Sequence, residues 1–247
     1  MPALHLFTDF GREGPYVGLM KAAARRAGLE DGAIVDLMHD APRFRPREAG
    51  LLLAALVPWL EADAAVAAVV DPGVGTARRA LIARVGGRIL TGPDNGLLVP
   101  TLEAARDAGE PVRVAEILWR PEKLSASFHG RDLFVPAAVR ALTGRPLETR
   151  PLAPDALAGW QDPPDPARII YIDGFGNAMT GLRAAALGEA ALVVAGRRLR
   201  RARTFGAVRE GEAFWYENSL GLAEIAANRG AAAALLDLSI GTPVAIA

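Results

Sequence analysis

The segment VAAVVDPGVGTARR, residues 66–79, decides the fold and carries the first candidates for chemistry. Its apolar beginning predicts a buried strand that ends at Asp71. Pro72 and the glycines after it predict a tight loop, which leads to Arg78 and Arg79. Ligands of open α/β sheets bind where strands end, so Asp71 and Arg78 are candidates for one pocket. A strand cap followed by solvated arginines is the alternative interpretation.

The composition indicates a chain with a sizeable core and no strong charge bias. Its 247 residues suit one large or two modest domains. Because 28 basic residues balance 28 acidic ones, neither nucleic acid nor an anionic membrane is expected as a partner. The absence of cysteine excludes disulfides, thiolate metal ligands and cysteine nucleophiles, and it fits a reducing compartment.

The N-terminal residues do not have the pattern of a signal peptide. No charged region precedes the first apolar residues, and Asp9 follows them too soon. The longest apolar segment, residues 50–60, is too short to span a bilayer. We therefore expect a soluble, cytoplasmic protein.

Residues 1–145 predict an α/β domain with a mostly parallel sheet flanked by helices. Short apolar strands alternate there with segments whose apolar residues recur at helical spacing. Strands are expected at 3–8, 33–38, 64–70, 80–85, 88–91 and 112–117, and helices at 16–27, 47–56, 97–108 and 133–142.

A proline-rich stretch predicts the domain boundary. Residues 146–167 hold six prolines and show little hydrophobic periodicity, so we expect a semi-extended linker. Residues 168–247 then predict a smaller, β-rich, barrel-like C-terminal domain. Its strands are expected at 168–172, 191–195 and 213–216.

Polar residues recur where the predicted strands end. In the first domain they are Asp9, Asp71 and His129, and in the second they are Asp173-Gly174-Phe175-Gly176-Asn177 and Asn218-Ser219. Each alone is typical of a turn. Their repetition at five strand ends indicates a functional site.

Other residues keep a plain interpretation beside a functional one. His5 lies in a predicted strand and is expected to be a packed histidine. His39 lies in a loop before Pro42, which is compatible with a solvated position. Phe44 is either a local hydrophobic anchor or an aromatic on which a purine can stack.

Residues 69–76 also resemble the first motif of Rossmann-like methyltransferases, in which an acid precedes Gly-x-Gly. The third glycine of that motif is replaced by Ala77. A dinucleotide-binding G-x-G-x-x-G fails as well, because Arg78 takes its last position. The methyltransferase match is therefore weak.

Taken together, motifs along nearly the whole chain are similar to those of the S-adenosylmethionine hydroxide adenosyltransferases, which are related to fluorinating and chlorinating enzymes. Each match is modest alone, but the ordered set is specific. The matching stretches are TDFG (8–11), GPYVG (14–18), 69–78, GPDNGLL (92–98), SFHGRD (127–132), DGFGN (173–177), and Asn218-Ser219 running on to Glu224-Ile225-Ala226 and Asn228.

The resemblance implies an N-terminal α/β domain, a C-terminal β domain and a homotrimer with active sites between subunits. It also implies the reaction, in which water or hydroxide displaces methionine from the ribose C5′ of S-adenosylmethionine (SAM). The products are adenosine and L-methionine. No metal and no cofactor are implied, since SAM is the substrate.

In the family pattern, Asp71, Arg78 and His129 hold and activate the water. An acid and an imidazole can accept or orient its proton, and a guanidinium favours developing hydroxide. The resemblance assigns substrate contacts to Asp9 (ribose hydroxyls), Phe44 (adenine stacking), Phe128 (ribose), Asp173 and Ser219 (methionine), Asn177 (adenine edge) and the backbone near Arg229 (adenine).

Asp71, His129 and Gly130 favour water over halide, because the chlorinating relatives have tyrosine at the first position and the fluorinating relatives have serine at the last. Leu220 stands where the fluorinating enzymes bind the methionine carboxylate with arginine, so the partner of that charge is open. The alternatives are a non-catalytic adenosine or SAM binder, a methyltransferase and a halogenase.

Overall fold

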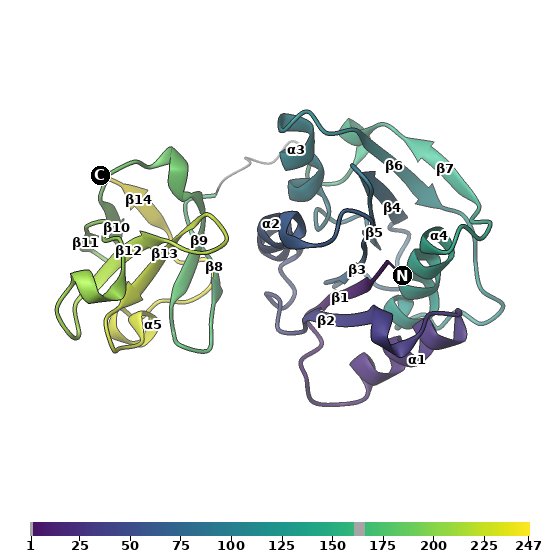
Figure 1. Cartoon of the computed structure of the whole chain (residues 1–247), viewed down its shortest axis with the longest axis horizontal. Helices are drawn as coiled ribbons and strands as arrows, with labels where there is room; N and C mark the ends of the chain where they lie inside the picture. The colour runs from purple at the N-terminus through teal and green to yellow at the C-terminus, as the bar shows by residue number, and fades with distance from the viewer. Residues whose placement is uncertain (1, 161–165) are drawn as a thin grey trace. The chain divides into compact units, whose positions relative to one another are not determined.

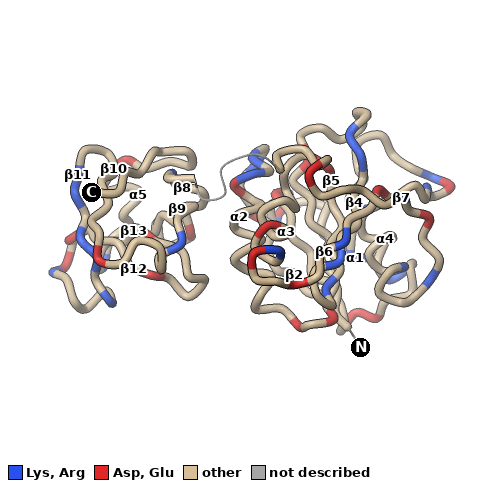
Figure 2. The backbone as a smooth tube through the Cα atoms, turned by 90° about the horizontal axis from the view of Figure 1, so that it is seen from above, with Lys and Arg blue, Asp and Glu red and all other residues tan. Residues whose placement is uncertain are grey.

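The computed structural model describes residues 2–160 and 166–247. The chain divides into two compact units, Met1–Asp162 and Pro163–Ala247 (Figure 1). Figure 2 shows acidic and basic residues interspersed over both units, with basic residues gathered at β11 (Arg197–Leu199). None of the helices in the described ranges has the length and apolar character that a bilayer crossing requires.

A seven-stranded sheet forms within residues 2–160, in the order β2-β1-β3-β5-β4-β6-β7. β2, β1, β3 and β5 pair in parallel, and β4 is antiparallel to both β5 and β6, so β6 runs with the parallel set. The expected mostly parallel α/β domain is therefore confirmed. Its strands are β1 (Leu4–Thr8), β2 (Ile34–Met38), β3 (Ala65–Val69), β4 (Ala80–Val85), β5 (Arg88–Pro93), β6 (Val112–Ile117) and β7 (Thr149–Leu152).

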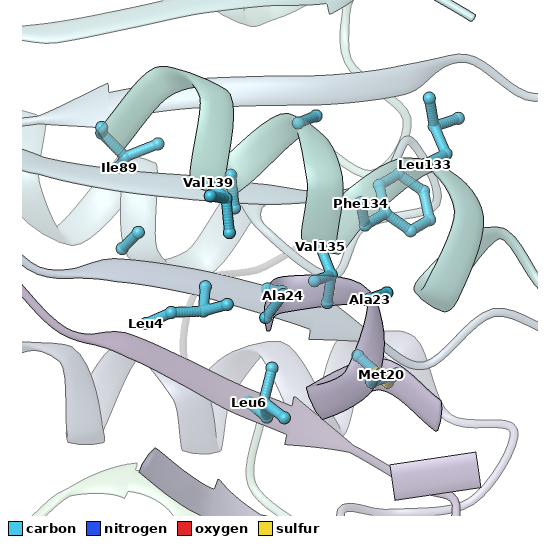
Figure 3. Packing of buried hydrophobic residues seen from close by; sticks show 14 of the residues in the cluster. Leu4, Leu6, Met20, Ala23, Ala24, Ile89, Leu133, Phe134, Val135 and Val139 are labelled. Atoms are coloured by element: carbon cyan, nitrogen blue, oxygen red, sulfur yellow. The ribbon is translucent and has the colours of Figure 1, made fainter. Parts of the chain in front are cut away.

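Helices cover both faces of this sheet, and each face has its own core. Leu4 and Leu6 of β1 pack with the helices of one face (Figure 3), whereas Phe7 packs toward the helices of the other face. The central strands are apolar at successive positions because both faces are buried. The first face carries α1 (Tyr16–Arg26) and α4 (Val135–Leu142), and the second carries α2 (Pro46–Leu56) and α3 (Val99–Asp107).

The linker predicted over residues 146–167 is wrong in its first half. Residues 149–152 form β7, which pairs with β6 at the edge of the sheet, and Leu157 is buried in the first unit's core. Pro151 is tolerated there because an edge strand leaves backbone positions unpaired. Residues 161–165 of the predicted linker lie outside the described residues, and the boundary in the rest of the stretch stays a prediction.

The second unit is β-rich, as predicted. Between residues 166 and 247 an antiparallel four-stranded sheet has the order β12-β13-β9-β8, and a three-stranded sheet has the order β11-β10-β14. Trp215 and Ile225 are fully buried between these elements. The further elements are β8 (Ile169–Ile172), β9 (Ala178–Arg183), β10 (Leu192–Val194), β12 (Ala213–Glu217), β13 (Leu222–Ala227), α5 (Ala232–Leu235) and β14 (Val244–Ile246).

Candidate active site

Polar residues of the first unit meet at the end of the parallel strands. β1 and β3 are neighbours in register, so Asp9 and Asp71, which follow them, lie at the same edge of the sheet. A cavity of about 510 Å³ opens there. It is lined by Asp9, Phe10, Tyr16, Arg43, Phe44, Val69, Asp71, Val74, Ser127, Phe128, His129 and Gly130.

Arg78 holds Asp71 with two hydrogen bonds. Its Nε donates to Oδ1 of Asp71 at 2.8 Å, and a terminal guanidinium nitrogen donates to Oδ2. The side chains of Arg78 and Asp71 are only 9% and 4% exposed. The guanidinium carbon of Arg78 lies 5.2 Å from the ring centroid of Phe134. A bidentate pair of this kind fixes both groups in one geometry.

The loop between these two residues depends on Gly75. Its φ of +80° is one that other residues rarely adopt, and a Cβ at this position would lie 2.6 Å from the carbonyl oxygen of Ala126. The loop can therefore approach the segment that leads to His129 only because glycine stands here.

His129 completes the cluster. Its Nδ1 lies 3.0 Å from the guanidinium of Arg78. Because arginine can only donate, Nδ1 accepts, and the proton of the neutral imidazole is on Nε2. Burial, followed by the positive charge of Arg78, lowers the pKa of His129 below its ordinary value. The site therefore favours a neutral histidine.

A π-helical turn, Gly130–Phe134, follows His129 and leads into α4. The helix predicted at 133–142 is thus preceded by a wider turn, and such turns often occur at functional sites. Asp71 and Arg78 belong to one loop, whereas His129 lies 51 residues after Arg78, and the three converge at the cavity, as expected. Among the described residues, Asp71 and His129 line the cavity and Arg78 joins them.

Arg79 has a structural role instead. Its Nε donates to Oδ2 of Asp94 at 2.6 Å, and Oδ1 of Asp94 accepts a hydrogen bond from the backbone of Ala158. Asn95 Nδ2 donates to the carbonyl oxygen of Val70 at 2.9 Å. The GPDNG segment therefore supports the end of β3.

Asp9 and Phe44 are joined across the cavity edge. The backbone N–H of Phe44 donates to Oδ2 of Asp9 at 3.3 Å. Burial raises the pKa of Asp9, although this hydrogen bond opposes the rise. Phe44 is 75% exposed and has a φ of +58°, which is strained for a bulky residue. Residues with strained backbones cluster at functional sites, so the conformation of Phe44 supports a functional role for this cavity.

Aromatic rings form another wall of the cavity. The ring centroids of Phe10, Tyr16 and Phe128 lie 5.5–5.9 Å apart in tilted and edge-to-face pairs. Phe128 was a sequence candidate, whereas Phe10 and Tyr16 were not, although both lie in motifs that carry the resemblance. Those motifs, together with the glycines around both residues, are the signals in the sequence that could have identified them as cavity-lining residues.

The candidates of the second unit surround a different cavity, of about 780 Å³. Asp173, Asn177, Ser219 and Arg229 all line it. Oδ1 of Asp173 accepts from the backbone N–H groups of Phe175 and Asn177 at 2.9 Å each, so its carboxylate orders the turn. The predicted contacts of these residues with substrate stay predictions.

A buried carboxylate in this cavity was missed from the sequence. Glu224 is 2% exposed and accepts hydrogen bonds from Tyr216 Oη at 2.6 Å and from Asn218 Nδ2 at 2.7 Å. Burial raises the pKa of Glu224. Glu224 lies in a stretch that carries the resemblance and inside the apolar run LAEIAA, but no role was assigned to it from the sequence.

The prediction for one of the two histidines outside the cluster is confirmed, and the position considered for the other is wrong. His5 is packed, as predicted, at 4% exposure with Nε2 2.9 Å from Glu61. The solvated position considered for His39 is wrong, because His39 is 3% exposed and hydrogen-bonded on both ring nitrogens.

Nothing in the described ranges groups three or more His, Asp or Glu side chains in a way that would hold a metal ion. The expectation that neither a metal nor a cofactor is needed stays a prediction.

Comparisons with known proteins agree with one another. Residues 4–150 match the SAM hydroxide adenosyltransferase N-terminal domain, and residues 167–245 match the C-terminal domain of the same family. A curated relative from Thermus thermophilus, named (R)-S-adenosyl-L-methionine hydrolase, is 42% identical over 260 residues and covers 99% of both chains. A relative of the same name from Salinispora arenicola is 36% identical, covering 97% of this chain and 95% of its own.

Solved structures show the same architecture over the full length. An uncharacterized conserved protein from Thermotoga maritima has a TM-score of 0.84 at 27% identity, covering 98% of this chain and 99% of its own. A conserved hypothetical protein from Thermus thermophilus has a TM-score of 0.78 at 37% identity, with complete coverage of both chains.

Proposed function

Because the chain belongs to the SAM hydroxide adenosyltransferase family, we propose that it is an enzyme that hydrolyses SAM to adenosine and L-methionine. The observation that carries the proposal is the convergence of Asp71, Arg78 and His129 at a cavity. The relatives' names specify the R form. Since "L" already fixes the α-carbon, R describes the sulfonium sulfur, and we assign the same epimer to this enzyme.

The chemistry needs a held nucleophile more than an acid. The sulfonium leaves as a neutral thioether, so the leaving group needs no proton. One water adds its oxygen to C5′, the C5′–S bond breaks with its electron pair going to sulfur, and one proton is released to solvent. In-line orientation and partial desolvation of the water are then the main tasks of the enzyme.

The cluster can carry out these tasks. Asp71, fixed by Arg78, accepts a hydrogen bond from the water, and Nε2–H of His129 can donate to its oxygen. The charge of Arg78 stabilises developing hydroxide. Phe10, Tyr16 and Phe128 give the cavity an aromatic wall, and aromatic rings can contact a cationic substrate favourably.

The remaining substrate contacts are proposals from the family pattern. Asp9 would accept from the ribose hydroxyls, and Phe44 would stack on adenine. Asn177 and the backbone near Arg229 would meet the adenine edge. Asp173 and Ser219 would meet the methionine part.

We also propose a homotrimer in the cytoplasm, with sites that combine the first unit of one subunit with the second unit of a neighbour. The distribution of candidates supports this, because each unit's cavity is lined by only part of the set.

Product analysis tests the proposal. Purified protein is incubated with the R epimer of SAM, and the products are separated. Adenosine and methionine in equal amounts support it. Unchanged SAM with saturable binding would indicate a non-catalytic binder. Formation of S-adenosylhomocysteine with an added acceptor would indicate a methyltransferase. Formation of 5′-halogenated adenosine would indicate a halogenase.

A further inference from the structure

A buried histidine connects the loops that carry Asp9 and Phe44. His39 follows β2 directly and has no place in the mechanism above. Its Nδ1 lies 2.9 Å from Oγ1 of Thr8, and its Nε2 lies 3.1 Å from Oδ1 of Asp36. Thr8 is the last residue of β1 and is fully buried.

The directions of these hydrogen bonds follow from the groups involved. A carboxylate accepts, so Nε2–H of His39 donates to Asp36, whose Oδ2 also accepts from Lys21 Nζ at 2.6 Å. In the neutral imidazole Nδ1 then accepts the Thr8 hydroxyl proton. Oγ1 of Thr8 in turn accepts from the backbone N–H of Phe10 at 3.3 Å. The chain of bonds therefore reaches the loop that contains Asp9.

Backbone contacts complete the connection between the loops. The N–H of Gly11 donates to the carbonyl oxygen of His39 at 2.6 Å, and the N–H of Ala41 donates to the carbonyl oxygen of Thr8 at 3.1 Å. Farther along, Phe44 N–H donates to Asp9. Hydrogen bonds therefore join the loop after β1 to the loop after β2. The His39 side chain lies where the two loops begin, and the Asp9–Phe44 pair lies farther along them.

Hydrophobic burial does not fix Phe44, since its side chain is 75% exposed and its backbone is in the left-handed region. Buried Ala41 anchors the start of the loop, and nearer the ring the hydrogen bond from the N–H of Phe44 to Asp9 holds the backbone. We propose that His39 is a positioning residue, which acts through Thr8 to set Asp9 and Phe44 for the ribose and adenine of the substrate. This inference rests on the proposed function.

Thr8→Val and Thr8→Ser form the matched test, because valine replaces the hydroxyl by a methyl group at nearly the same volume, whereas serine keeps the hydroxyl and loses only the methyl group. Valine leaves Nδ1 of His39 and the Phe10 N–H without their partner, so we expect KM for SAM and Kd for adenosine to rise about tenfold. The value of kcat should stay within about twofold, because the water-binding cluster is untouched. Thr8→Ser should behave like the wild type.

A variant at a partly exposed residue and a double variant distinguish a positioning role from an effect on folding. Asp36→Ala removes the acceptor of His39 at a side chain that is 41% exposed, and it should raise KM in the same direction by a smaller factor. In an Asp9→Ala background, Thr8→Val should add little, because its effect passes through Asp9. Full additivity would overturn the proposal.

The outcomes also distinguish this inference from the proposed function. If wild-type protein neither hydrolyses SAM nor binds adenosine, the proposed function fails. If the wild type is active but Thr8→Val, Thr8→Ser and Asp36→Ala all share its KM, only the positioning role fails. A fall in kcat at unchanged KM would also overturn it. If Thr8→Val does not fold, Asp36→Ala decides the question by its KM.

Discussion

At the scale of single residues, Arg78 determines the state of the groups beside it. It donates to both oxygens of Asp71 and to Nδ1 of His129, and it has no acceptor of its own. It therefore fixes the carboxylate and selects the tautomer in which His129 presents Nε2–H. Replacing it should disturb chemistry more than binding.

Neighbouring arginines provide a matched test of this assignment. Arg78→Lys loses the bidentate geometry, and we expect kcat to fall at least about 100-fold while Kd for adenosine changes little. Arg79→Lys disturbs the hydrogen bonds to Asp94 and to the carbonyl oxygen of Ala156, which lie outside the Asp71–Arg78–His129 cluster, so kcat should stay near the wild-type value. Steady-state kinetics and calorimetric binding of adenosine measure both variants. Similar losses in the two would show that Arg78 is only structural.

Arg78 and Asp71 should have opposite effects on the pKa of His129. Its pKa is lowered by burial and by Arg78, while Asp71 raises it, so the neutral form should persist below pH 6.5. We predict that kcat/KM stays level as pH falls to 6.5 and declines only at more acidic pH. By NMR titration, Arg78→Gln should raise the pKa of His129, and Asp71→Asn should lower it. Shifts of the opposite sign would contradict the described cluster.

Phe44 has a strained backbone and an exposed side chain. Substitutions of Phe44 should therefore affect protein stability and substrate binding differently. Left-handed backbone costs an L-residue about 1–2 kcal/mol, and glycine's added chain entropy costs about 0.5–1 kcal/mol. Phe44→Gly should therefore be more stable than Phe44→Ala by up to about 1.5 kcal/mol in chemical denaturation. Both should raise KM, since both lose the ring. A wild-type KM in either variant would remove Phe44 from the substrate site.

At the scale of elements, glycines in two helices have opposite environments. A Cβ on Gly50 in α2 would overlap the carbonyl oxygen of Leu97, whereas nothing lies within 4 Å of a Cβ on Gly18 in α1. Gly50→Ala should lower the free energy of unfolding by about 1–3 kcal/mol. Gly18→Ala should raise it by about 0.5–1 kcal/mol through helix propensity. Equal effects in urea denaturation would contradict the close packing at α2.

Elements with strong periodicity could be predicted from the sequence, and weakly patterned ones could not. The β6 strand was predicted with the observed ends, 112–117, because its β-branched residues Val112, Val114 and Ile117 follow the turn residues at 109–111. β13 was missed because LAEIAA is rich in alanine, which is not typical of strands. β7 was missed because its proline suggests a linker, and only the tertiary pairing with β6 makes it a strand.

The candidate site shows the same division. Strand ends and motifs identified Asp71, Arg78 and His129, which are joined by hydrogen bonds in the structure. His39 and Glu224 were not found, since only burial and hydrogen-bond partners distinguish them from ordinary polar residues. Sequence patterns report strand ends well, but they do not report the buried polar network beneath a site.

At the scale of the whole molecule, the candidate residues line two cavities, one in each unit, and the proposed sharing of sites between subunits can be tested by combining two defective chains. We predict that co-expressed Asp71→Ala and Asn177→Ala chains form mixed trimers with activity at about one quarter of the sites. Each variant alone should be nearly inactive at substrate concentrations well below KM. Mixed assemblies without activity would show that sites are not shared between subunits.

The central claim is that water attacks C5′ of the ribose, and hydrolysis in H₂¹⁸O tests it most directly. Mass spectrometry of the products should find one ¹⁸O in adenosine and none in methionine, at a rate that Asp71→Asn reduces at least about 100-fold. Label in methionine, no adenosine, or an unchanged rate in Asp71→Asn would contradict the account.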